Sequence, residues 1–215
     1  MHKFFNLMLG AALLSTAALA QTNPEVAADP LGPFDAYQVR YAANLQNGPS
    51  VVNLTNAGTV GGDDVNDYIC ANVYVFAQDQ QLISCCSCPL SPNDLKSLNV
   101  QSDLINNTLT PGVPTGVTIG LVATEDYLGF GPHTCNAAIP DFLVPGLRAW
   151  GTTVHAAPAG GFAVTETEFA YAGLSPGEYA KMTSFCGFIQ ADGSTFGICN
   201  ACTTATAQGG SKSIK

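Results

Sequence analysis

The fold is decided by residues 68–88, YICANVYVFA QDQQ LISCCSC, in which two apolar runs flank a polar tetrapeptide. Tyr68–Ala77 is rich in Val, Tyr, Ile and Phe, residue types that favour strands. Gln78–Gln81 has the length of a hairpin loop. The segment therefore predicts a β-hairpin whose second strand, Leu82–Cys88, carries three cysteines.

The same composition recurs along the chain between clusters of Gly, Asn and Asp. It predicts five further strands: Tyr37–Leu45, Ser50–Thr55, Val117–Thr124, Leu147–Ala156 and Phe162–Tyr171. Seven strands separated by turns are typical of a sandwich or a barrel. We expect a mainly β fold, a disulfide-stapled β-sandwich of the Ig-like or jelly-roll-like kind, with one or two short helices.

Two tetrapeptides, Ser91–Asp94 and Ser175–Glu178, resemble helix starts, with Ser at the N-cap, Pro at the first helical position and an acid two residues later. The first predicts one or two turns. The second predicts a longer helix with an apolar face, formed by Tyr179, Met182, Phe185, Cys186 and Ile189, and a stop at Asp192-Gly193. As an alternative, Asp192-Gly193 is a two-residue hairpin turn, which would place Cys186 opposite Cys199.

Residues 1–20 have the parts of a cleaved signal peptide, namely a short basic start, an apolar run and Ala18-Leu19-Ala20 before the cut. The apolar run is short for a membrane anchor. Residues 21–33 contain three prolines and predict an extended N-terminal arm, residues 34–202 a single β-rich domain, and residues 203–215 a disordered tail. We expect a secreted protein that is extracellular, periplasmic or on the cell surface.

The chain is acidic, with 16 Asp and Glu against 7 Lys and Arg and a net charge of −9. Cleavage after Ala20 removes Lys3 and makes the net charge −10. The remaining basic residues form no cluster, so binding to nucleic acid or to an anionic membrane is disfavoured. No second apolar stretch is long enough for membrane insertion. Only 11% of the residues are charged, which does little to block self-association.

An even number of cysteines in an exported chain predicts disulfides. The eight are Cys70, Cys85, Cys86, Cys88, Cys135, Cys186, Cys199 and Cys202. Adjacent residues have α-carbons about 3.8 Å apart, too close for an unstrained disulfide. Cys85 and Cys86 should therefore each find a distant partner, from opposite faces of their strand. We expect four disulfides, with the connectivity left open.

Cysteines also bind metals, act as redox pairs and attach haem. Thiolate binding of zinc or copper would use Cys85, Cys86, Cys88, Cys199 and Cys202, but an oxidising compartment consumes thiols. A redox-active Cys199-x-x-Cys202 lacks the helix and strand context that such motifs need. Covalent haem requires His at position 203, where the chain has Thr. No cofactor is expected.

No catalytic residue is predicted. Gly173–Gly177 matches a nucleophile elbow, but Pro176 has no N–H for an oxyanion, so Ser175 is expected to cap a helix. His133 and His155 are interpreted as isolated. Glu166 and Glu168 share a strand face without an aromatic cluster beside them, which indicates a solvent-facing surface.

A calcium candidate lies at Asp63, Asp64, Asn66 and Asp67, after two glycines. The spacing does not fit an EF-hand, so a solvated turn is favoured over a metal site.

Ile69–Phe76, the Cys-Cys-Ser-Cys motif and residues 188–202 together resemble a group of secreted bacterial proteins of unassigned function. The resemblance spans most of the mature chain. It implies extracellular or periplasmic residence and no activity.

These features favour a secreted, non-enzymatic structural or surface protein, such as a filament-forming or self-assembling subunit. Its partners would be copies of itself or other extracellular proteins, and the arm could add to a neighbour's sheet edge. The alternative is a secreted binding module for a carbohydrate, Ca²⁺ or a partner protein. A secreted hydrolase is the third hypothesis.

Overall fold

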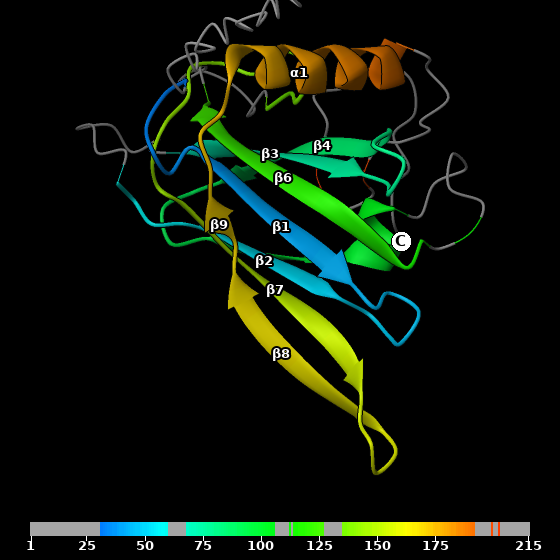
Figure 1. Ribbon diagram of the computed structural model, residues 1–215. Coiled ribbons are helices and arrows are strands. Elements are labelled where there is room, and N and C mark those ends of the chain that lie inside the picture. Colours follow the sequence, from blue (N-terminus) through cyan, green and yellow to red (C-terminus); the bar gives the residue numbers. More distant parts are fainter. Residues whose placement is uncertain are drawn as a thin grey trace, which may run out of the picture.

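A computed structural model describes residues 31–59, 68–105, 112, 114–126, 135–191, 199 and 202. These residues form two antiparallel sheets packed face to face, with an α-helix on the outside (Figure 1). The first sheet has the order β4 (Leu82–Leu90), β3 (Ile69–Phe76), β6 (Gly116–Glu125), β1 (Tyr37–Ala43) and β9 (Ala170–Tyr171). The second has the order β5 (Leu95–Asn99), β2 (Val51–Asn56), β7 (Leu147–Ala156) and β8 (Phe162–Glu168). The predicted mainly β sandwich is confirmed.

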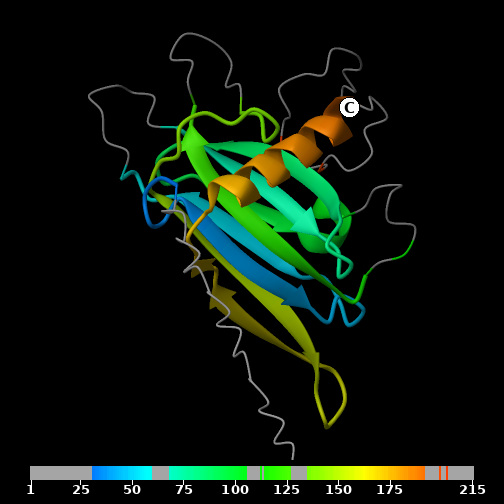
Figure 2. The same cartoon turned by 45° about the horizontal axis from the view of Figure 1, so that its top comes forward.

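The hairpin of residues 68–88 is also confirmed, since β3 and β4 pair along their whole length. Strand β3 is buried on both faces. Its Ile69 and Val73 belong to the core between the sheets, whereas Tyr74 belongs to a second cluster beneath α1 (Pro176–Ala191). Figure 2 shows α1 lying across the outer face of the first sheet. Burial from both sides explains why this strand is apolar almost throughout.

Helix α1 begins as predicted, because the Ser175 hydroxyl accepts a hydrogen bond from the backbone N–H of Glu178 at 3.1 Å. Met182, Cys186 and Ile189 form its buried face. Phe185 was expected on that face, but 45% of it is exposed. The alternative hairpin is wrong, because Cys186 is helical and pairs with Cys85 rather than Cys199. Asp192-Gly193 lies outside the described residues.

The helix predicted from Ser91 is wrong. Asn93 has a φ of +64°, which a right-handed helix cannot continue, and its N–H donates to the carbonyl of Asn56 at 2.8 Å. The chain then forms β5 against β2. A π-helical turn, η1 (Val100–Leu104), follows and is capped by Asn99. Pairing with β2 overrides a helix signature that is purely local.

The predicted signal peptide of residues 1–20, most of the 21–33 arm and the 203–215 tail lie outside the described residues. The base of the arm is attached to the domain, since the N–H of Leu31 donates to the carbonyl of Leu174 at 2.7 Å. A detachable arm therefore ends before Leu31. In the described part of the chain, no helix has the length and apolarity needed to span a bilayer.

Candidate functional site

All eight cysteines are joined in disulfides. The pairs are Cys70–Cys135, Cys85–Cys186, Cys86–Cys199 and Cys88–Cys202. Neighbouring cysteines of β4 face opposite sides, as predicted from the strand geometry. Cys85 ties β4 to α1, whereas Cys86 and Cys88 tie it to the 199–202 segment on the inner side of the sheet.

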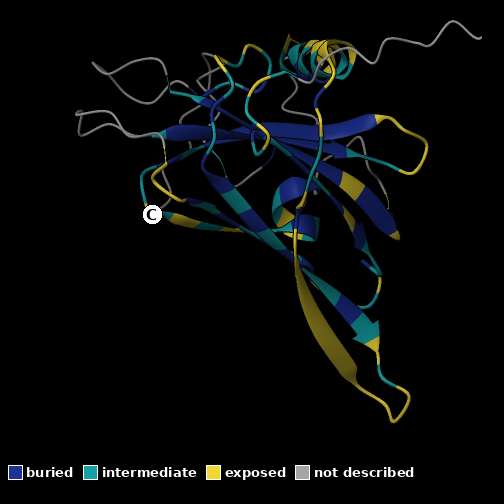
Figure 3. Cartoon of the chain, turned by 60° about the vertical axis from the view of Figure 1, so that its left-hand side comes forward, coloured by how far each residue is buried: buried dark blue, intermediate teal, exposed yellow. Residues whose placement is uncertain are grey.

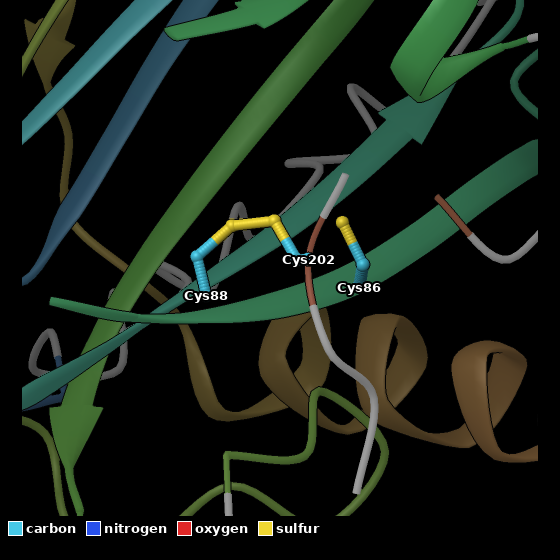
Figure 4. A group of neighbouring side chains, drawn as sticks. All are labelled: Cys86, Cys88 and Cys202. Carbon is cyan, nitrogen blue, oxygen red and sulfur yellow. A yellow bond between two sulfur atoms is a disulfide. The ribbon is translucent and has the colours of Figure 1, made fainter. Parts of the chain in front are cut away.

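The sulfurs of Cys86, Cys88 and Cys202 lie within 4.8 Å of one another, close enough for a shared metal ion (Figure 4). Each of these sulfurs is half of a disulfide, however, and zinc takes thiolates. The oxidised protein therefore holds no thiolate set here. Cys199 and Cys202 are bonded to β4 and not to each other, so the redox interpretation of Cys199-x-x-Cys202 is wrong.

A more unusual feature is β8, an edge strand whose seven residues are all exposed. Figure 3 shows it running out with β7 as a hairpin that extends beyond the body of the sandwich. Phe162 and Val164 are 65% and 62% exposed on this strand. Natural proteins usually protect such an edge with Lys, Pro, a bulge or a covering segment. In the first half of β8, Phe162–Thr165, there is no Lys, Pro or bulge, and no other described segment covers this part of the edge.

The hairpin is anchored to the body by Arg40 of β1, whose guanidinium is buried between the sheets. Its Nη2 donates to the Thr153 hydroxyl at 2.8 Å and its Nε to the Thr167 hydroxyl at 3.2 Å. Burial lowers the pKa of Arg40, and the charge of Glu166 acts in the opposite direction. Nη1 has no hydrogen-bond partner among the described residues. The feature of the sequence that indicates this anchor is Arg40 itself, a charged residue at an inward position of β1. Arg40 is not among the predicted site residues.

The outer face of the hairpin corrects one argument from the sequence. Trp150 lies directly opposite Glu168 in the β7–β8 ladder, so Glu168 has an aromatic neighbour, whereas Glu166 lies opposite Thr152. The hydroxyl of Tyr171 also donates to Glu168, at 3.4 Å. Both acids are exposed, and Glu166 accepts a hydrogen bond from the Asn53 amide at 2.9 Å. This arrangement is a hydrogen-bonded sheet surface.

Of the remaining predicted residues, the two that the structure describes, His155 and Ser175, lie on separate elements. His155 lies on β7 and bonds to the Thr165 hydroxyl at 2.9 Å, on the exposed hairpin. Ser175 caps α1. His133 and the calcium candidates Asp63, Asp64, Asn66 and Asp67 lie outside the described residues.

A groove of about 370 Å³ lies between α1 and the outer face of the first sheet. Strands β1 and β6 form its floor, the β3–β4 turn one wall and α1 the other. Its characteristic side chains are aromatic or polar: Tyr37, Tyr41, Phe76, Gln78, Gln80, Glu178 and Lys181. No short stretch of sequence indicates this groove, because these residues come from four separate elements.

No family model, curated protein or solved structure matches this chain. The resemblance to secreted bacterial proteins therefore stays a prediction, and any functional assignment depends on the geometry described above.

We expect Tyr37→Phe to reduce the loss of stability at high pH. Burial, and then the charge of Glu178, raise the pKa of Tyr37 from 10.0 to about 12. In the unfolded chain the Tyr37 hydroxyl ionises near pH 10.0, whereas in the folded protein it stays protonated up to about pH 12. The unfolded state therefore gains stability relative to the folded state as the pH rises through this range, and the free energy of unfolding falls. Free energies of unfolding of both proteins, measured across this range, should converge or cross. Parallel curves would contradict the prediction.

Proposed function

We propose that the mature chain is a secreted, non-enzymatic structural protein that self-assembles through strand β8. One observation carries this proposal, namely an edge strand whose residues are exposed on both of its faces. Its unpaired N–H and C=O groups form a template for another strand. Phe162 and Val164 supply apolar surface that a second strand would cover.

A second copy of the chain fits this edge when the two β8 strands run antiparallel. With Thr165 at the centre, Val164 of one copy faces Glu166 of the other, and Phe162 faces Glu168. No acid then faces an acid. A parallel, in-register pair would stack Glu166 on its own copy, and like charges opposite each other are destabilising. Antiparallel pairing gives a two-fold dimer with one continuous sheet.

The opposite edge of the second sheet, strand β5, is less suited than β8 to pairing with a second copy of the chain. Strand β5 is two residues shorter than β8, and its Lys96 forms an ion pair with Asp94 at 3.6 Å. Pairing of two β8 strands uses this edge of both copies and gives a closed dimer. A filament would need a second interface between dimers, so the dimer is the unit from which larger assemblies would grow.

Secretion is supported by the signal-like residues 1–20 and by the four disulfides, which persist in oxidising compartments. The absence of enzymatic activity is supported by His155, because its hydrogen-bond partner is a threonine on an exposed hairpin. The second candidate, a binding module, is favoured by the groove beneath α1.

We expect Val164→Glu to weaken self-association of residues 21–215 by about tenfold or more, which corresponds to about 1.4 kcal/mol. The new carboxylate would face Glu166 of the other copy, twice by symmetry. Sedimentation equilibrium measures the dimer dissociation constant. Thermal melting should change little, since Val164 is 62% exposed.

The matched control is Leu95→Glu, because Leu95 is 63% exposed on the opposite edge of the same sheet. It should leave the dimer intact. Val164→Lys would place an ammonium group opposite Glu166 and should keep or strengthen the dimer. A monomeric wild-type chain at high concentration, or equal loss in both Glu variants, would contradict assembly through β8.

A further inference from the structure

We infer that the groove between α1 and the first sheet binds a neutral saccharide. This site is independent of assembly through β8, because it lies on the other sheet and on its outer face. Its volume of about 370 Å³ lies within the range of small-molecule sites.

The floor of the groove is an open aromatic platform. Tyr41 is 60% exposed and lies across Gly116, where an added Cβ would be 2.6 Å from the tyrosine oxygen. Tyr37 lies over Gly120 in the same way, with a hypothetical Cβ 3.4 Å from its ring. The two glycines leave room for both rings beside β6, where Tyr41 is exposed and Tyr37 is half-buried. The exposed ring of Tyr41 offers a surface on which the apolar C–H side of a sugar ring can stack.

Charge in the groove is balanced. Lys181 and Glu178 of α1 form an ion pair at 3.6 Å. The ammonium of Lys181 also lies 5.2 Å from the centre of the Phe76 ring. Because Lys181 already occupies the cation position over Phe76 and is neutralised by Glu178, the site favours neither a second cation nor an anion.

The polar groups of the groove suit a ligand with many hydroxyls. Gln78 and Gln80 each carry an amide that can donate and accept, Glu178 accepts and Lys181 donates. A neutral molecule with one apolar face and a rim of hydroxyls satisfies the aromatic floor and these walls together. Saccharides have this chemistry.

Isothermal titration of residues 21–215 with maltotriose, cellotriose, chitotriose and mannotriose tests the inference. At least one trisaccharide should bind, and Tyr41→Ala should weaken that binding by about tenfold or more, since stacking area is lost. Glu178→Gln keeps the shape of the wall and should weaken binding less. Val164→Glu lies outside the groove and should bind like the wild type, even though it impairs assembly.

Melting curves verify that each variant is folded. Failure of all four trisaccharides to bind at millimolar concentration would overturn the inference. Unchanged binding by folded Tyr41→Ala would overturn it as well. Neither result would affect the proposal for β8, because that proposal is measured by sedimentation.

Discussion

Removal of the Cys85–Cys186 disulfide by the double substitution Cys85→Ala and Cys186→Ala should lower the free energy of unfolding by about 3 kcal/mol. Although the two cysteines are 101 residues apart in sequence, the intact Cys86–Cys199 disulfide links them by a shorter path. In the unfolded chain the Cys85–Cys186 bond therefore closes a loop of about 15 residues. Both cysteines are fully buried in the cluster beneath α1. Guanidinium unfolding of the oxidised proteins, followed by circular dichroism, measures the change.

The control for this prediction is the pair Cys70→Ala and Cys135→Ala, whose sequence separation is 65. The other disulfides do not shorten the loop of this pair, so loop entropy predicts a global loss of about 4 kcal/mol, slightly larger than that of the Cys85–Cys186 variant. Only the Cys85–Cys186 variant should accelerate hydrogen exchange in α1, because that disulfide alone joins α1 to β4. A global loss below about 1 kcal/mol would show that packing holds the helix without the disulfide.

The second large effect is expected at Asn72 on β3, which is completely buried. Its amide donates to the carbonyl of Val122 and to the hydroxyl of Thr124, both at 3.0 Å, and its oxygen accepts from Ser87 at 2.7 Å. Asn72→Ala leaves the Val122 carbonyl and the Thr124 and Ser87 hydroxyls without these hydrogen bonds in the buried interior. We expect a loss of about 3 kcal/mol, because unsatisfied buried polar groups cost about 1–3 kcal/mol each.

Asn53→Ala on β2 is the matched control. Asn53 also makes side-chain hydrogen bonds in both directions, to Glu166 at 2.9 Å and from Ser97 at 2.7 Å, but in contact with solvent. Water replaces those bonds, so the expected loss is about 0.5 kcal/mol or less. Chemical denaturation of both variants gives the comparison. Equal losses would mean that burial does not set the energy of the Asn72 network.

Local patterns predicted the parts of the fold that depend on neighbouring residues. The β3–β4 hairpin follows from two strand-forming runs around a four-residue turn. The start of α1 follows from Ser175 and Pro176, which satisfy and preset the first helical turn. The same pattern of Ser, Pro and an acid at Ser91 wrongly predicted a helix. There the pairing of β5 with β2 decides the conformation.

The candidate sites were beyond such reasoning. Phe162–Tyr171 was predicted as one strand, but it is divided into β8 in the second sheet and β9 in the first. Whether a strand lies at an edge depends on the order of all strands in its sheet. The groove joins residues of β1, β6, α1 and the β3–β4 turn, which no short window of sequence contains. Trp150 and Glu168 are neighbours only because β7 and β8 pair in one register.

The cysteines show the same division. The sequence was enough to predict that they form disulfides and that Cys85 faces away from Cys86 and Cys88, because alternation along a strand is local geometry. The partners depend on the folded chain, since α1 on one face of β4 and Cys199 and Cys202 on the other bring distant cysteines within Cα separations of 4.9 to 5.8 Å. Disulfide partners are chosen by proximity in the folded chain, and that proximity arises from packing over the whole sandwich.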